Sequence, residues 1–231
     1  MSDRSIKLFY DTNGNVKCRI WYFRGKVHNL HDPARITYYP SGNVQSHMFY
    51  TYGAKNISSK PVKIEYYDVP ENESGELYTC VYDPKKFIIK QKVRRIEYIE
   101  GIYRIIKYYN FNQSLHRDED KPAYSIIYNK YYSTEHYYIN GKLHRENDKP
   151  STWCYMCRQI YMEFRQYGIL HRNLGPAYIS FLPERKTIWY NNGNIIDDVT
   201  KYITKYIDEA MYEIDQYDCN LSYIIAEYYY S

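Results

Sequence analysis

The chain has 231 residues, of which 31 are Lys or Arg and 27 are Asp or Glu, so its formal net charge at pH 7 is only +4. Because the charges also alternate in sign, the sequence excludes a strong long-range field that gathers nucleic acid or an anionic membrane. Tyr is unusually frequent, with 33 residues, and aromatic residues make up 19% of the chain. Tyrosine favours strands because its ring packs on a pleated surface while its hydroxyl reaches water. We therefore expect a mainly β protein with a largely aromatic buried surface.

The N-terminal sequence MSDRSIKLFYDTNG has no basic region followed by an apolar run, which predicts that it is not a secretory signal. No stretch of the chain approaches the roughly 18–20 apolar residues that a membrane-spanning helix needs. The five cysteines are odd in number and scattered, and this favours free thiols in a reducing compartment. We expect an intracellular, cytoplasmic protein.

A repeated frame is visible within the chain itself. Each unit is anchored on a glycine or on a residue that replaces it, and the anchors are Gly25, Gly53, Gln113, Gly141, Gly168 and Gly193. The first interval between anchors is 28 residues, the third is 28 and the fourth is 27. The second interval is 60 residues, which leaves room for one degenerate unit or insert around 68–108. Such a period predicts a repeat architecture.

Other residue types recur at fixed distances from the anchor. An aromatic residue stands four positions before it, as Trp21, Phe49, Tyr109, Tyr137, Phe164 and Trp189. Three positions after it stand His28, Asn56, His116, His144 and His171, and Arg follows the last three of these. A proline comes five or six residues further on, as Pro33, Pro61, Pro122, Pro150 and Pro176. The residues one, three and five positions after this proline form one face of a predicted strand.

Alternation at period 2 between glycine turns predicts short antiparallel strands joined by tight turns. One such hairpin cannot bury its aromatic face alone, whereas stacked neighbours bury a continuous stripe. The predicted fold is therefore a solenoid-like array of antiparallel β-hairpins over residues 1–195. Over residues 196–231, apolar residues from Val199 to Ile214 recur at three- and four-residue steps, which predicts a C-terminal capping helix. The last segment, 219–231, fits either a helical turn or an edge strand.

The frame resembles the MORN repeat (membrane occupation and recognition nexus). The resemblance rests on the pattern W-x-x-x-G-K-x-H-x-x-x-x-P-x-x-I-x-Y-x-x-x-G from Trp21 to Gly42, on Y-x-N-G-K-L-H-R at 138–145 and on H-R-N-L-G-P-A at 171–177. It covers about residues 7–195, more loosely between 68 and 108, and it is similar to the divergent MORN-like repeats common in large DNA viruses of amoebae. The resemblance implies a hairpin solenoid with structural, assembly or protein-binding roles, located in the host cytoplasm or the virion.

Arg117, Arg145 and Arg172 form the candidate surface-binding set, because one Arg per unit predicts a basic stripe that holds phosphates. Acidic and amide residues follow each of them, so the alternative is that the His-Arg pairs hydrogen-bond their own turns and neighbours. Cys154 and Cys157 have the spacing of half a zinc site, but residues three apart in a strand point to opposite faces. The sequence predicts no catalytic residue, no metal site and no cofactor, since it contains none of the familiar catalytic or phosphate-binding motifs.

The function that these features favour is a non-enzymatic scaffold for protein–protein interaction or self-association. A peripheral membrane or phospholipid-binding module is the alternative. Such a module needs a basic face with an aromatic rim; the tyrosines supply the rim, but the small net charge does not supply the basic face. A third hypothesis places nucleic-acid chemistry in the basic part of 68–108, with Arg94 and Arg95, but lysines that protect a strand edge explain the same composition. Neither nucleic acid nor a small-molecule substrate is favoured as a partner.

Overall fold

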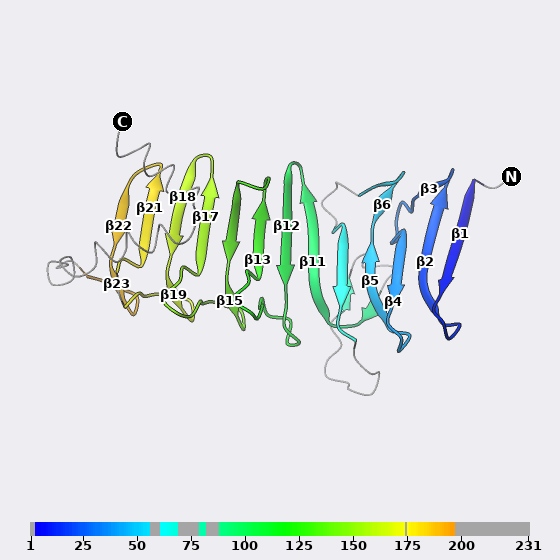
Figure 1. Cartoon of the computed structure of the whole chain (residues 1–231), viewed down its shortest axis with the longest axis horizontal. Helices are drawn as coiled ribbons and strands as arrows, with labels where there is room; N and C mark the ends of the chain where they lie inside the picture. Colours follow the sequence, from blue (N-terminus) through cyan, green and yellow to red (C-terminus); the bar gives the residue numbers. More distant parts are fainter. Residues whose placement is uncertain (1–2, 56–60, 69–78, 82–87, 174, 197–231) are drawn as a thin grey trace.

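The computed structural model describes residues 3–55, 61–68, 79–81, 88–173 and 175–196. This part of the chain is mainly β and contains no helix, which confirms the predicted class (Figure 1). Its strands are antiparallel to their neighbours. No helix in these ranges is long and apolar enough to cross a membrane. The predicted helical cap over 196–231 lies outside the described residues except for Ile196.

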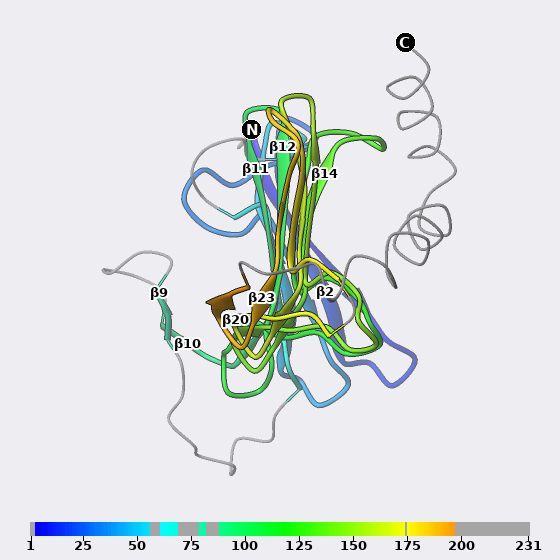
Figure 2. The same ribbon diagram turned by 90° about the vertical axis from the view of Figure 1, so that its left-hand side faces the viewer.

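One long sheet forms the body of the molecule. Its strands follow the order β1-β2-β4-β5-β8-β11-β12-β13-β14-β17-β18-β21-β22, and the two ends do not pair with each other. The bounds are β1 Arg4–Tyr10, β2 Val16–Phe23, β4 Arg35–Tyr38, β5 Val44–Met48, β8 Lys63–Tyr66, β11 Val93–Glu100, β12 Tyr103–Tyr108, β13 Tyr124–Ile127, β14 Ser133–His136, β17 Thr152–Met156, β18 Gln159–Glu163, β21 Tyr178–Leu182 and β22 Lys186–Ile188. Figure 2 shows these strands superimposed as one thin layer, so within the described ranges no second sheet packs against either face.

Short two-residue strands project from the rims of this sheet. They are β3 Lys26–Val27, which pairs with β2, and the hairpins β6–β7 (Tyr50–Thr51, Ala54–Lys55), β15–β16 (Tyr138–Ile139, Lys142–Leu143), β19–β20 (Arg165–Gln166, Ile169–Leu170) and β23–β24 (Tyr190–Asn191, Asn194–Ile195). A further pair, β9 Thr79–Val81 and β10 Ile88–Lys90, lies within the 68–108 segment.

The anchor glycines form the turns of these short hairpins. Gly141 has φ +80° and the residue before it, Asn140, has φ +49°, which are the dihedral angles of a type I′ turn. Similar φ values recur at the other anchor glycines and the residues before them, for example at Tyr167 (φ +49°) and Gly168 (φ +93°). Glycine is needed at the second position because other residues adopt such a φ only with strain.

The anchor turn has a different role from the one that the sequence predicted, because it closes a short hairpin outside the main sheet. We expected it to join two strands of the main array, whereas turns such as 39–43 and 157–158 join those strands instead. The aromatic residue before the anchor explains the difference. The amide of Tyr137 donates to the Ser151 carbonyl (2.8 Å), and its own carbonyl accepts from the His144 amide (3.0 Å). The chain therefore leaves the main sheet at this residue and folds back on itself.

The unit anchored on Gln113 departs from the frame by one residue. The carbonyl of Tyr108, and not that of Tyr109, accepts from the His116 amide (3.1 Å), and the amide of Tyr108 donates to Ala123 (2.7 Å). Tyr108 thus occupies the aromatic position that the sequence frame assigned to Tyr109. The loop before Gln113 is correspondingly longer, which agrees with the loss of the anchor glycine.

The degenerate 68–108 segment reverses the orientation of the array. Other pairs of consecutive anchors are separated by two strands of the main sheet, but three strands (β8, β11 and β12) lie between Gly53 and Gln113. A tight turn at Gly101 joins β11 to β12 where a short hairpin would otherwise project. An odd number of strands moves the next hairpin to the opposite rim. In Figure 1, β6 consequently lies at the upper rim, and β15, β19 and β23 lie at the lower rim.

Small residues after the recurrent proline fill the tightest positions of the sheet. Ala34, Ala123, Ser151 and Ala177 have no exposed surface, and Val62 is 1% exposed. Buried apolar side chains of the sheet pack in two clusters. The first contains Phe49, Ile64, Tyr66 and Val93, and the second contains Met162, Phe164, Ala177 and Ile179. The position directly after the recurrent proline is thus buried in all five units.

Replacing Phe164 by Ala tests whether the second cluster stabilises the sheet. Phe164 is 4% exposed, so Phe164→Ala leaves a cavity and we expect it to lower the free energy of unfolding by about 3–5 kcal/mol. Urea unfolding followed by circular dichroism measures the change. Phe111→Ala is the control, because this ring is 40% exposed, and an equal loss in the two variants would contradict the assignment of the core.

Candidate functional site

Backbone hydrogen bonds join the short hairpins of successive units into columns. In each bond the amide of an anchor glycine donates to the carbonyl of the residue two positions after the preceding anchor. The bonds are Gly53 to Val27 (2.9 Å), Gly141 to Leu115 (2.8 Å), Gly168 to Leu143 (2.7 Å) and Gly193 to Leu170 (2.9 Å). The two columns are separate, because the reversal of rims falls between Gly53 and Gln113.

The recurrent histidines add a second connection between units. Nδ1 of each histidine accepts from the backbone amide just before the next anchor glycine. The pairs are His28 with Tyr52 (3.2 Å), His116 with Asn140 (3.2 Å), His144 with Tyr167 (3.4 Å) and His171 with Asn192 (3.1 Å). A backbone amide can only donate, so Nδ1 must be unprotonated. Each ring is therefore neutral in this arrangement and carries its proton on Nε2.

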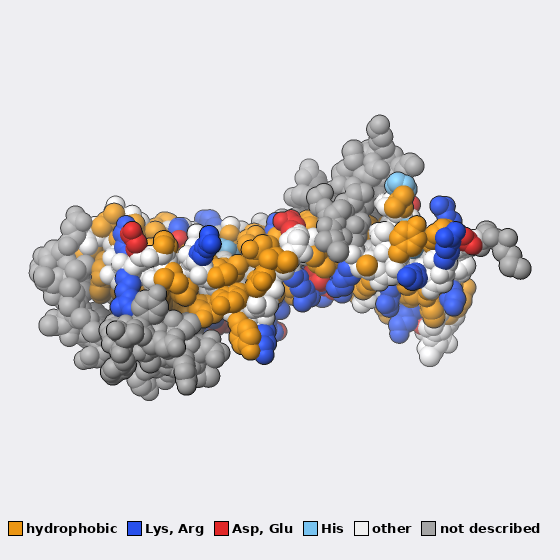
Figure 3. Space-filling model, turned by 90° about the horizontal axis from the view of Figure 1, so that it is seen from above, with side chains coloured by type: hydrophobic (Ala, Val, Ile, Leu, Met, Phe, Trp, Pro, Cys, Tyr) orange, Lys and Arg blue, Asp and Glu red, His pale blue; other side chains and the backbone are white. Residues whose placement is uncertain are grey.

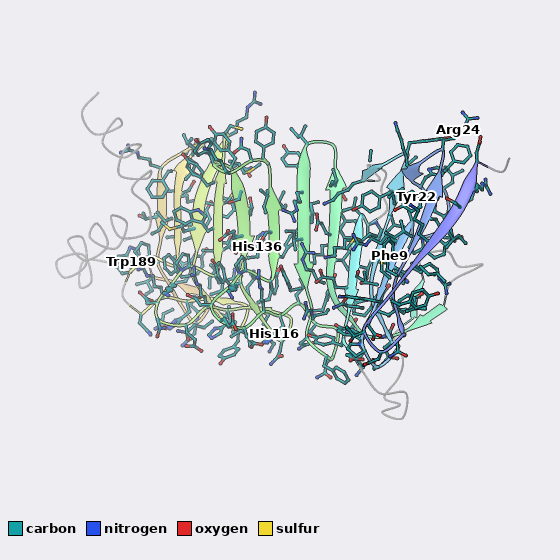
Figure 4. All side chains as sticks on the ribbon, turned by 45° about the vertical axis from the view of Figure 1, so that its right-hand side comes forward. Phe9, Tyr22, Arg24, His116, His136 and Trp189 are labelled. Atoms are coloured by element: carbon teal, nitrogen blue, oxygen red, sulfur yellow. The ribbon has the colours of Figure 1, made fainter. Side chains whose placement is uncertain are left out.

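The other ring nitrogen is also occupied in three of the four units. Nε2 of His116 donates to Asp118 (2.9 Å), that of His144 to Glu146 (2.8 Å) and that of His171 to the Asn173 side-chain oxygen (2.9 Å). These histidines therefore have no nitrogen left for a metal ion or a reacting proton. Figure 4 shows His116 in the lower part of the molecule, below His136, whose backbone lies in the main sheet.

Arg145, one of the candidate surface-binding residues, is engaged by the preceding unit. Its Nε and Nη2 donate to the two carboxylate oxygens of Asp120 at 2.6 and 3.1 Å, and its Nη1 donates to the Pro150 carbonyl at 3.3 Å. The guanidinium carbon also lies 3.7 Å from the centre of the Tyr137 ring. The hydrogen bond from Arg145, aided by Lys149, lowers the pKa of Asp120 to about 2.

Arg172 repeats this arrangement one unit later. Its Nε donates to Asp148 at 2.8 Å, and its guanidinium lies 3.8 Å from the centre of the Phe164 ring. Arg117 lies over the Tyr108 ring at 3.9 Å, but no carboxylate of the described residues is within ion-pair distance of it. The structure therefore places each Arg on a ring of its own unit and ties two of them to an Asp of the preceding unit. Their use as a ligand-binding stripe stays a prediction.

A buried carboxylate connects the short hairpin β6–β7 to the main sheet. The Glu97 side chain is 2% exposed and is 2.9 Å from Arg95 Nη2, 3.0 Å from Arg104 Nε and 3.3 Å from Lys55 Nζ. Burial opposes ionisation of Glu97, but the hydrogen bond from Arg104 and the other cations outweigh it and lower its pKa to about 2. Arg95 is thus committed to Glu97, whereas Arg94 is exposed and 3.5 Å from Glu65. The two arginines of the nucleic-acid hypothesis therefore occupy different environments.

The two cysteines of the weak zinc motif are also in different environments. Cys154 is buried in β17 and accepts from the Thr134 hydroxyl at 3.3 Å, whereas Cys157 is exposed in the turn that follows. Burial raises the pKa of the Cys154 thiol, which disfavours the thiolate that a metal needs. Within the ranges that the structure describes, no group of three His, Cys, Asp or Glu residues is arranged to hold a metal ion.

Sequence reasoning missed an exposed aromatic surface on the upper rim, which we call the rim patch and define as Ile102, Tyr103, Tyr128 and Tyr131. Their exposed fractions are 64%, 37%, 40% and 57%. The Tyr103 and Tyr128 rings are 5.9 Å apart between centroids. Figure 3 looks onto this rim and shows hydrophobic side chains gathered along its middle. The aromatic run between two predicted strands, Y-N-K-Y-Y at 128–132, was the signal that could have indicated it.

We compared the chain with family models, curated proteins and solved structures, and none of them matches it. The expected kinship with MORN repeats consequently stays a prediction.

Removing the carboxylate of Asp148 tests whether the Arg–Asp contacts hold the units together. Asp148→Asn removes the negative charge that pairs with the Arg172 guanidinium, whose side chain is 3% exposed, and it keeps a residue type that tolerates the left-handed backbone at this position (φ +54°). We expect the free energy of unfolding to fall by about 3 kcal/mol, because breaking a buried pair strands a charge. Urea denaturation measures it. Asp118→Asn is the control, since the Asp118 side chain that contacts His116 is 84% exposed, and it should change stability by less than about 1 kcal/mol.

His47 makes the stability of the sheet sensitive to acid. The residue is 4% exposed, its Nδ1 is 3.1 Å from the Tyr66 hydroxyl, and burial lowers its pKa to about 4. The unfolded state, in which His has a pKa near 6.5, binds the proton more readily, so stability falls as pH drops from about 6.5 to 4. The loss attributable to His47 should be about 2 kcal/mol at pH 5.

His47→Gln provides the comparison for this prediction. Glutamine keeps an oxygen that can accept from Tyr66 but does not titrate. Unfolding free energies measured between pH 7 and 5 should therefore fall less steeply for the variant than for the parent chain. Parallel curves would show that His47 does not contribute to the acid sensitivity.

Proposed function

We propose that this chain is a non-enzymatic scaffold, built as a solenoid-like array of MORN-like β-hairpins, which binds another protein inside the cell. The observation that carries the proposal is the recurrence of the same contacts from unit to unit. The anchor amide, the histidine Nδ1 and the Arg–Asp pair each connect one unit to its neighbour. Stability in such an array accrues at the interfaces between neighbours, as expected for a repeat protein.

The commitment of polar groups to internal contacts supports a binding role over a catalytic one. His116, His144 and His171 have both ring nitrogens occupied, and Glu97 is neutralised by the cations around it. A general acid or base needs a titratable group that reaches a substrate. These histidines and Glu97 are instead bound to other groups of the chain. Among the described residues, the extended surface of the sheet is the feature that best suits a function.

The rim patch is the part of this surface best suited to a protein partner. Exposed tyrosines are enriched at interfaces because they bury a large apolar area and keep a polar end. Tyr128 also lies 6.2 Å from Tyr132 between ring centroids, and the Tyr132 ring is 5.6 Å from that of Tyr155, which extends the aromatic row toward β17. A partner that covers this row would find rigid anchors of the kind that dominate binding energy.

A membrane surface is the alternative ligand for the rim patch, because Lys130 lies 4.5 Å from the centre of the Tyr131 ring. A cation beside exposed aromatic residues suits the interface of an anionic bilayer. However, Glu100 is exposed at the same rim, so the charge is mixed. The mixed charge favours a protein partner.

A double substitution in the rim patch tests the proposal. Partners crosslinked to the full chain in extracts of its own cell are identified by mass spectrometry, purified and titrated against the parent chain and against Tyr128→Ser/Tyr131→Ser. We expect affinity to fall more than about tenfold in the double variant, since aromatic anchors carry much of the energy of an interface.

Two further measurements complete this experiment. Ile195→Ser removes an apolar side chain that is 58% exposed in a short hairpin away from the rim patch, and it should leave the affinity unchanged. Flotation with phosphatidylcholine vesicles, with and without phosphatidylserine, separates the alternatives. Flotation that moderate salt abolishes would contradict the protein-binding proposal and support the membrane alternative.

A further inference from the structure

The first strand of the sheet has the exposure of an interface without its partner. All seven residues of β1 are exposed, including Ile6 (58%), Leu8 (41%), Phe9 (47%) and Tyr10 (57%). Within the described residues β1 pairs with β2 alone. An exposed, apolar edge strand of this length is a template for pairing with another chain.

The backbone groups that face outward can be assigned from one hydrogen bond. The amide of Arg24, just beyond β2, donates to the Asp3 carbonyl at 2.8 Å, so the backbone groups of Asp3 point toward β2. Because these groups alternate along a strand, those of Ser5, Lys7 and Phe9 also face β2. The amides and carbonyls of Ile6 and Leu8 therefore point away from the sheet.

The protection of the sheet edge is weak in β1, whose charged residues are Arg4 at its start and Lys7 at its centre. Edge strands are usually short, charged or interrupted by proline. The opposite edge follows this rule, since β22 has three residues, begins with Lys186 and comes after Glu184 and Arg185. In β1 the single central cation, Lys7, lies 5.2 Å from the centre of the Tyr22 ring. It is therefore drawn toward β2 and away from the open edge.

We propose that two copies of this chain associate through antiparallel pairing of β1 with β1 about a two-fold axis. The proposal rests on the proposed scaffold function and names a second copy as one of its partners. Neighbouring strands are antiparallel along a path of thirteen strands from β1 to β22, so β1 and β22 run in the same direction. In a head-to-tail association, β22 of one copy would pair with β1 of the next, and these two strands would be parallel. A two-fold axis at β1 instead pairs β1 with β1 and continues the antiparallel pattern.

Side-chain chemistry selects the register of this pairing. A two-fold axis through Lys7 would set two like charges opposite each other, which is destabilising. An axis through Leu8 sets Leu8 against Leu8 of the second copy and Ile6 against Tyr10 of the second copy. An open groove of about 640 Å³ lies beside Ile6, lined also by Trp21 and Phe23. It lies on the face where the second Tyr10 side chain would arrive.

Proline substitutions at the two edges test the proposal. Ile6→Pro removes an outward amide and no hydrogen bond to β2, and such a proline is tolerated on an edge strand. Sedimentation of the full chain from micromolar to near-millimolar concentration should give a dimer for the parent and a monomer for Ile6→Pro. Thr187→Pro is the matched control. The Ala177 amide donates to the Ile188 carbonyl, so the Thr187 amide points outward from β22, and this variant should remain dimeric.

Leu8→Lys keeps the test decisive if circular dichroism shows that Ile6→Pro disturbs the fold. The exposed Leu8 side chain can be replaced without loss of core packing, and two lysines would then meet at the axis. We expect the dimer dissociation constant to rise more than about tenfold. In the parent, amide exchange at Ile6 and Leu8 should slow as concentration increases, while that at Thr187 should not.

Three results would overturn the β1 dimer: a parent chain that is monomeric throughout, a dimer that Ile6→Pro and Leu8→Lys leave intact, or a dimer that Thr187→Pro dissociates. These outcomes are distinct from failure of the scaffold proposal. The β1 variants leave Tyr128 and Tyr131 unchanged, so binding at the rim patch succeeds or fails independently of the dimer.

Discussion

The fold depends on the coupling of an anchor turn to the unit before it, which recurs at Gly53, Gly141, Gly168 and Gly193. The turn requires φ near +50° at residues as large as Tyr52 and Tyr167, which costs free energy for a side chain with a Cβ. Two acceptors of the preceding unit compensate for this cost, because its histidine binds the amide of the strained residue and its carbonyl binds the amide of the glycine. The His144 ring also stacks on Tyr167 at 4.1 Å. An isolated unit would have the strained turn without these acceptors.

The same coupling gives the recurrent His and Arg residues a structural role. The unprotonated Nδ1 connects four pairs of neighbouring units. In the two pairs that end at Arg145 and Arg172, an Asp of the preceding unit adds a second contact. Asp120 and Asp148 make this contact with left-handed backbone conformations, φ +50° and +54°, which Asp tolerates better than most residues. Contacts between neighbouring units are therefore sufficient to explain why these residue types recur in the sequence frame.

The sequence predicted the class of the fold well because the signal was periodic. Alternation, anchor glycines and the small residue after proline are local requirements, and Ala34 and Ala177 occupy the buried positions that the frame assigned to them. The position of the anchor turn outside the main sheet could not be predicted in the same way. It depends on whether the carbonyl of Tyr137 bonds to its own unit or to a neighbouring strand, and both choices fit an alternating pattern.

The candidate site was harder to predict than the fold, because exposure depends on which rim a turn occupies. The three strands between Gly53 and Gln113 move the later hairpins to the lower rim and leave the turns at Gly101 and 128–132 together on the upper one (Figure 1). A degenerate unit with lost anchor residues gives no periodic signal from which strands can be counted. The parity of that one segment thus decides where the aromatic turns gather. It also makes β1 and β22 run in the same direction, so a single irregular unit shapes both the rim surface and the ends of the sheet.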